Sequence, residues 1–155
     1  MAEALAALGN LVRNAGGPRG DARLTAVQKV AEARQLVSIA MFEAPLMDRR
    51  IRQRSYEEST VQRIDRLAAA TFVVAAQPGR EDIGDAARTQ DAAAAQWLED
   101  AGAHLAAGET PPAPPRASIA PTAALSPETP SSLRAAIEAR AFLQREIEHA
   151  AATPV

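Results

Sequence analysis

The stretch VQRIDRLAAATFVVAA, from Val61 to Ala76, decides the fold class. Its apolar and small side chains recur at intervals of three and four residues, which places them on one side of an α-helix. They are Val61, Ile64, Leu67, Ala68, Thr71, Val74 and Ala75. A helix with one apolar face must bury that face against other elements. Because no segment of the chain shows the alternating pattern of a β-strand, the sequence predicts an all-α protein.

Upstream of this stretch the sequence predicts three helices. Proline disfavours helical geometry in the residue before it and is favoured in the first turn of a helix, so Pro45 separates a helix over about 21–43 from one over about 46–76. A first helix over about 2–14 ends at the Gly/Pro-rich run NAGGPRG. We expect its buried side to carry Leu5, Leu8 and Val12. In the helix over 21–43, the expected buried stripe is Leu24, Val27, Ala31, Val37, Ala40 and Met41.

Downstream, a fourth helix is predicted over about 81–107, with a stripe of Ile83, Ala87, Gln90, Ala94, Trp97, Leu98, Ala101 and Leu105. The composition then changes, because the segment from Gly108 to Ser132 holds seven of the eleven prolines. A last helix over 131–152 shows a stripe of Leu133, Ile137, Arg140, Ala141, Gln144 and Ile147, with Leu143 at its margin.

These elements predict an up-down helical bundle of about five helices with one long Pro-rich crossing connection. The expected organisation is a helical bundle over 1–108, a Pro-rich linker over 109–130 and a final helix over 131–152 that packs on the bundle. An extended proline-rich chain rises ~3.1 Å per residue, so this linker spans the length of a helix. The last helix can therefore lie parallel to its predecessor.

Composition limits the classes of function. The chain has 155 residues, a formal net charge of -2 and no cysteine, which excludes disulfides, thiolate metal sites and cysteine nucleophiles. Nucleic-acid binding usually needs a basic field, so we expect no nucleic-acid partner. No segment reaches the ~18 consecutive apolar residues that cross a bilayer. Alanine makes up about a quarter of the chain, which favours closely packed helices.

Motifs for catalysis or cofactor binding are missing from the sequence, so we expect no enzyme, cofactor or metal site. The Glu-x-x-His string from Glu146 to His149 has the spacing of di-iron bundle proteins, but such a site needs a second string and two further glutamates. Trp97 lies on an apolar stripe and is most simply a core residue.

One cluster of charge stands out at the start of the third helix, formed by Arg49, Arg50, Arg52 and Arg54. Its simplest interpretation is a solvated helix start beside Glu57 and Glu58. A second interpretation is contact with anionic lipid headgroups, and nucleic acid is the third.

Two motifs resemble bacterial fusaric acid resistance / aromatic acid exporter proteins, in the region between their two transmembrane blocks. EARQLVSIAMFEAP, from Glu32 to Pro45, is similar to that family's "ar.ll..a.fEp" pattern, with Ala44 inserted. LAAGETPPAPP, from Leu105 to Pro115, is similar to its "lAaG.pPp.P" pattern. The order of helices also fits.

The resemblance implies a cytoplasmic soluble domain of an inner-membrane exporter of aromatic or weak organic acids, with an assembly, gating or partner-contact role. Its partners would be the transmembrane segments of the parent protein or of a partner membrane protein, and self-association is a further expectation. The arginine cluster would then be membrane-proximal. Two alternatives stay open: a free-standing structural or coat protein of the phasin type, and a small-molecule-binding helical regulator.

Overall fold

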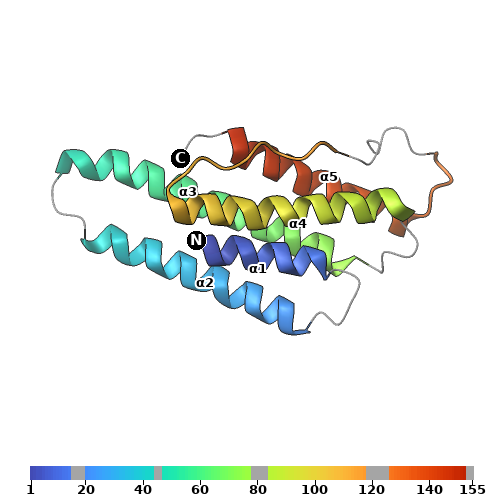
Figure 1. Cartoon of the computed structure of the whole chain (residues 1–155), viewed down its shortest axis with the longest axis horizontal. Helices are drawn as coiled ribbons and strands as arrows, with labels where there is room; N and C mark the ends of the chain where they lie inside the picture. Colours follow the sequence, from blue (N-terminus) through green and yellow to red (C-terminus); the bar gives the residue numbers. More distant parts are fainter. Residues whose placement is uncertain (15–19, 44–46, 78–83, 118–125, 153–155) are drawn as a thin grey trace.

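A computed structural model of the chain describes residues 1–14, 20–43, 47–77, 84–117 and 126–152, without the side chains of residues 40–60. Its elements are five α-helices (Figure 1): α1 (Ala2–Arg13), α2 (Gly20–Glu43), α3 (Met47–Ala76), α4 (Gly84–Ala107) and α5 (Ser131–Ala152). The part of the chain so described holds no β-strand, which confirms the predicted all-α bundle. The described helix bounds agree with the expected ones to within one residue, and residues 81–83 of the predicted fourth helix lie outside the described residues.

The first four helices alternate in direction, and α5 then runs in the same direction as α4 (Figure 1). Contacts between α4 and α5 also show that the two helices run in the same direction. Asp91 pairs with Arg140, and Ala101 lies near Ala150, which is the same number of residues further along its own helix. The described residues 108–117 run back along the bundle from the end of α4 (Figure 1), as the predicted crossing connection requires.

Helix α1 lies at the centre of the molecule. It packs against α2, α3 and α4, and its contact with α4 is the most extensive between any two helices. Helix α5 completes a four-helix arrangement by packing against both α3 and α4, while α2 lies against α1 and α3. Half of the twelve residues of α1 are therefore buried: Ala4, Leu5, Leu8, Gly9, Leu11 and Val12.

Small residues bring α1 and α4 close together. A Cβ atom added at Gly9 would lie 2.8 Å from the carbonyl oxygen of Ala95, and one added at Gly102 would lie 2.8 Å from that of Ala2. These distances are shorter than real side chains allow, so both glycines are required by packing. The alanine-rich composition thus serves a close antiparallel helix pair.

The expected buried stripes of α3 and α4 are confirmed wherever the structure describes their side chains, with Val61 and Leu105 half-buried at the ends and Ile83 outside the described residues. The prediction for α2 was wrong. Leu24 is 68% exposed and Val27 is 48% exposed, and Ala31 also faces solvent. The core side of α2 instead carries Ala26, Val30 and Ala33, with Val37 half-buried, while Ala40 and Met41 lie outside the described side chains.

The apolar residues of α2 explain this error. They form two stripes on opposite sides of the helix, so periodicity alone does not say which one faces the core. The stripe with the smaller side chains faces α1 and α3, where alanines permit close approach. The larger side chains remain on the outside.

Candidate functional site

The most elaborate polar arrangement in the described residues lies between α4 and α5. The Arg140 guanidinium donates from Nε to Asp91 Oδ1 at 2.9 Å and from Nη2 to Asp91 Oδ2 at 2.8 Å. A third bond runs from Arg140 Nη1 to the carbonyl oxygen of Ala136 at 3.1 Å. The two side chains are only 3% and 1% exposed. Two parallel bonds from a guanidinium to a carboxylate fix the helices in register, because both groups are planar.

Next to this pair, the proline-rich segment 108–117, here called the strap, crosses both helices. The indole Nε1–H of Trp97 on α4 donates to the carbonyl oxygen of Pro112 at 3.0 Å. The amide Nε2 of Gln144 on α5 donates to the carbonyl oxygen of Pro115 at 2.6 Å and to Glu148 Oε1 at 2.9 Å. Buried side chains from two helices therefore hold the strap at two points.

The start of the strap is set by the end of α4. Gly108 has φ +71°, a left-handed conformation that favours glycine. Its N–H donates to the carbonyl oxygen of Leu105, and the N–H of Glu109 donates to that of His104 at 2.8 Å. This pair of bonds is the Schellman motif, which ends a helix and turns the chain back. The Gly108 that the family resemblance includes is thus a structural requirement.

Beneath the strap lies an apolar cavity of about 60 Å³. Trp97, Leu105 and Pro111 line it on one side, and Met1 and Ala150 come from the two ends of the chain's described part. Arg63, which is half-buried, is the one charged residue among the described residues that line it. Such a volume is well below the ~150 Å³ of an engineered protein cavity that holds benzene.

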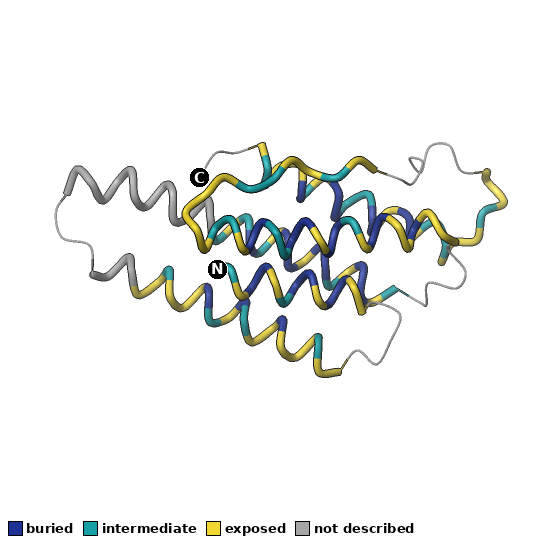
Figure 2. Tube along the Cα trace, viewed as in Figure 1, coloured by how far each residue is buried: buried dark blue, intermediate teal, exposed yellow. Residues whose placement is uncertain are grey.

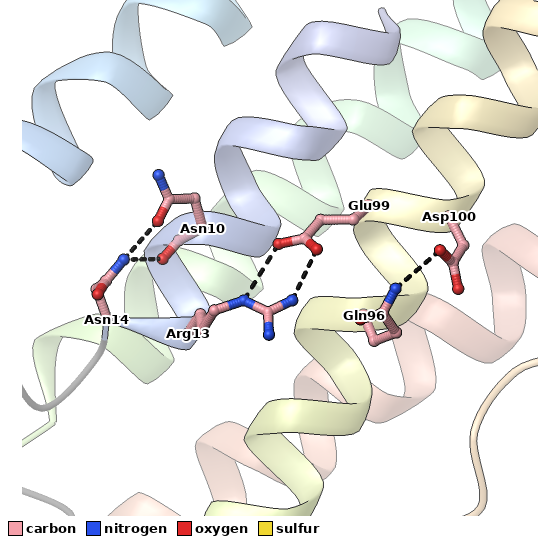
Figure 3. A network of polar contacts seen from close by, with 6 residues as sticks. All are labelled: Asn10, Arg13, Asn14, Gln96, Glu99 and Asp100. Carbon is pink, nitrogen blue, oxygen red and sulfur yellow. Dashed lines mark hydrogen bonds and ion pairs between the residues drawn. The ribbon is translucent and has the colours of Figure 1, made fainter.

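A second network joins α1 to α4 at the surface (Figure 3). Arg13 donates from Nη2 to Glu99 Oε2 at 2.7 Å and from Nε to Glu99 Oε1 at 3.3 Å. Asn14 caps the end of α1 by donating to the carbonyl oxygen of Asn10 at 2.9 Å. Gln96 donates to Asp100 along α4. Because these groups are open to solvent, they contribute little to stability.

Ion pairs also join α2 to its neighbours. Lys29 Nζ lies 2.7 Å from Glu3 Oε2 on α1 and 2.9 Å from Glu32 Oε2. The hydrogen bond to Glu3, and then that to Glu32, raises the pKa of Lys29, while the bond from Lys29 lowers the pKa of Glu32. Arg34 Nε lies 2.6 Å from Asp65 Oδ1 on α3, and this bond raises the pKa of Arg34.

The candidates predicted from the sequence are the arginine cluster, Trp97 and the histidines. Arg49, Arg50, Arg52 and Arg54 lie in the first turns of α3, and their side chains are outside those that the structure describes. Trp97 is a core residue at 5% exposure, as expected, with an additional bond to the strap.

Neither histidine is a core residue. His149 is exposed, and His104 is half-buried with its Nδ1 atom 3.2 Å from Glu109 Oε2. The described residues contain no group of three or more His, Cys, Asp and Glu side chains able to hold a metal ion.

Asp91 is the residue that the sequence interpretation missed. Gln90, Arg140 and Gln144 lie on the predicted stripes and are buried, as expected. Asp91 lies beside the α4 stripe, and a buried arginine on the opposing helix was the available signal that a buried carboxylate must accompany it. Chemically, the site orders the strap and aligns two helices, and its carboxylate is already bound by the guanidinium.

None of the helices, over the residues that the structure describes, is long and apolar enough to cross a membrane. The chain matches no protein-family model, no curated protein and no solved structure.

Proposed function

We propose that this chain is the helical domain of a bacterial inner-membrane exporter of aromatic or weak organic acids, positioned at the cytoplasmic face. Its role there is assembly, gating or contact with the transmembrane segments of the parent protein or of a partner membrane protein. The proposal rests on the resemblance between two sequence motifs and the exporter family, and on the order of helices.

One observation supports it most. The motif from Leu105 to Pro115 acts as a structural unit: Gly108 ends α4, and Pro112 and Pro115 accept bonds from Trp97 and Gln144. A motif with a defined structural task is better evidence of relationship than a shared alanine-rich composition. These bonds also hold the strap against both α4 and α5.

The reading frame of the natural gene gives a direct test. We expect it to continue on both sides into blocks of hydrophobic spans of ~20 residues each. A frame with no such spans on either side overturns the proposal. Where the spans are present, deletion of the gene should lower the concentration of fusaric acid that inhibits growth, and re-expression of the whole gene should restore it.

The arginine cluster has its own test. A basic residue near an anionic membrane contributes about 1 kcal/mol, which is roughly a fivefold change in partitioning. Replacing Arg49, Arg50, Arg52 and Arg54 by glutamine should reduce co-sedimentation with phosphatidylglycerol vesicles, and Arg116→Gln in the exposed part of the strap is the control. Equal binding by all three proteins contradicts a membrane-proximal cluster.

A second candidate is a free-standing coat protein of the phasin type. The exposed apolar side chains of α2 favour it, because a coat protein needs an apolar surface for its granule. It predicts co-sedimentation with polyester or neutral lipid particles that is insensitive to the arginine substitutions.

A further inference from the structure

The strap has the sequence of a polyproline II helix. Every residue from 110 to 115 is a proline or precedes one, so the backbone of each is restricted towards extended conformations. In the structure the segment contains neither helix nor strand. A polyproline II helix has three residues per turn and rises ~3.1 Å per residue, so residues three apart lie on one side of it. Pro112 and Pro115 therefore share a side.

The two bonds that hold the strap follow this period of three. Trp97 of α4 donates to the carbonyl oxygen of Pro112 at 3.0 Å, and Gln144 of α5 donates to that of Pro115 at 2.6 Å, which is one turn further along the strap. Burial agrees, because these two prolines are half-buried whereas residues 113 and 114 between them are exposed (Figure 2). Donors on two helices are thus spaced to match a polyproline II backbone.

An apolar cavity completes the contact. Pro111 lines this cavity together with Trp97 and Leu105, so a proline ring lies beside an aromatic side chain. Domains that bind proline-rich peptides dock them on aromatic-lined surfaces, because the polyproline II conformation is already formed before binding. Since proline has no N–H group, the receiving surface must donate to its carbonyl groups. We call Trp97, Gln144 and the residues that line the cavity the strap site.

The strap does not use all the hydrogen-bonding capacity of this site. Gln144 is 5% exposed, and its Oε1 atom is buried without a hydrogen-bond partner among the described residues. A buried acceptor without a donor lowers stability, so a segment that also offers a donor to this atom should bind more tightly than the strap does. The strap is therefore an occupant that another proline-rich segment can replace.

We propose that the strap site binds a proline-rich segment of a partner protein in the polyproline II conformation, and that the strap is its internal competitor. The segment carries two pairs of prolines separated by one residue, because PPAPP of the strap shows which chemistry the site accepts. A competitor within the same chain acts at an effective concentration of the order of millimolar, so it weakens binding from outside. The site is independent of the proposed exporter role, because contacts within this chain form it.

A synthetic peptide of residues 109–117, ETPPAPPRA, tests the proposal on the full-length chain. In the strap variant, the four prolines between positions 111 and 115 are replaced by serine, which frees the site and keeps Trp97 and Gln144. Trp97 is the only tryptophan, so its indole N–H gives a single NMR resonance. This resonance should move in the strap variant and return towards its wild-type position as the peptide binds. The wild-type chain should bind the peptide about tenfold more weakly, because its own strap competes.

Two controls separate recognition from non-specific binding. The peptide ETSSASSRA, with serine at the four proline positions, should not bind. In the strap variant, Gln144→Met keeps the size of the side chain but removes the donor, and it should weaken peptide binding about fivefold. Gln96→Ala, at an exposed position of the same helix as Trp97, should leave binding unchanged. Circular dichroism verifies that the variants fold.

Two outcomes overturn the proposal: a folded strap variant that does not bind the peptide at about 2 mM, or a wild-type chain that binds it as tightly as the strap variant does. If the wild-type chain itself binds the strap variant as tightly as the peptide does, the occupant is a second copy instead of a separate partner.

The wild-type chain provides a second test, which needs no folded strap variant. Peptide in excess should displace the strap and so expose the bond after Arg116 to trypsin. The peptide ETPPAPPQA has no arginine and resists trypsin, and at about 2 mM it should raise the cleavage rate at least about threefold. ETSSASSQA should leave the rate unchanged. A rate that does not respond to the proline peptide shows that the strap cannot be replaced, and overturns the proposal.

Discussion

Arg140 of α5 and Asp91 of α4 form a two-point ion pair in a region where their side chains are 3% and 1% exposed. Removing two charges from water has a large cost, and their attraction repays it only while both remain. The pair therefore aligns the two helices, because it requires α4 and α5 to meet in one register.

Removing either partner should be far more damaging than removing both. Arg140→Met leaves a buried carboxylate and Asp91→Leu leaves a buried guanidinium, and each should lower the free energy of unfolding by about 3–5 kcal/mol. The double variant should recover most of that loss. Urea denaturation of the four proteins measures the coupling. The exposed Arg13–Glu99 pair is the control, and Arg13→Gln should cost less than about 1 kcal/mol. Additive effects at Asp91 and Arg140 would contradict this account.

The strap should open when its bond to Trp97 is removed. Trp97→Phe keeps an aromatic ring in the core but leaves the Pro112 carbonyl without its donor, at a cost of about 1 kcal/mol. Trypsin cleavage after the exposed Arg116 should then be about fivefold faster, since cleavage follows the population of the open form. The rate is measured by mass spectrometry of early fragments. Gln96→Ala, at the exposed neighbouring position, should leave the rate unchanged, and an equal rate in Trp97→Phe would show that the strap is held in another way.

Gly9 should not accept even a methyl group. The added Cβ would lie 2.8 Å from the Ala95 carbonyl oxygen, so α1 and α4 must separate, and we expect Gly9→Ala to destabilise the fold by about 1–3 kcal/mol. This outweighs the helix propensity that alanine adds. Gly20 is the matched control because nothing lies within 4 Å of its added Cβ. Gly20→Ala should be neutral or slightly stabilising, and thermal unfolding of both variants decides the matter.

Features that are formed by local interactions were predictable from the sequence, and features that depend on contacts between distant segments were not. Each helix is formed by interactions between residues close in the sequence. Pro45, Gly108 and the spacing of three and four residues in α3 were therefore sufficient to predict the helices. The crossing connection was predictable because its proline content is a local property as well. The length of that connection permits the parallel arrangement of α5.

The remaining features depend on contacts between distant segments. Helix α1 was predicted to bury three residues, but it lies between three helices and also buries Ala4, Gly9 and Leu11. The choice between the two apolar stripes of α2 was made by its neighbours. Asp91 appears as an ordinary surface carboxylate until Arg140, 49 positions later, lies opposite it.

Lowering the pH should remove part of the stabilisation that the ion pair between Lys29 and Glu32 of α2 provides. The bond from Lys29 holds the pKa of Glu32 below its ordinary value. A carboxyl group with a lowered folded-state pKa stabilises the fold above its unfolded-state pKa of about 4.3, and this contribution disappears as the pH falls through the folded-state pKa. Glu32→Gln should thus melt below wild type at pH 7, and the difference should shrink below about pH 4. In the Lys29→Met background the difference at pH 7 should be largely lost; if it persists, Lys29 is not its cause.

Thr71 offers a stabilising substitution. Its side chain is fully buried, and its hydroxyl Oγ1 has no hydrogen-bond partner among the described residues. A buried hydroxyl without a partner costs about 1–3 kcal/mol in proteins, so Thr71→Val, which replaces it by a methyl group of similar shape, should raise the free energy of unfolding by about 1 kcal/mol. Thr71→Ser should instead lower it, because the hydroxyl stays and a buried methyl is lost. Thr89 is the control: its exposed hydroxyl donates to the Asp85 carbonyl at 2.9 Å, so Thr89→Val removes a bond that exists and should bring no gain. Urea unfolding of the three variants ranks them directly, and a destabilised Thr71→Val protein would show that the hydroxyl does find a partner in solution.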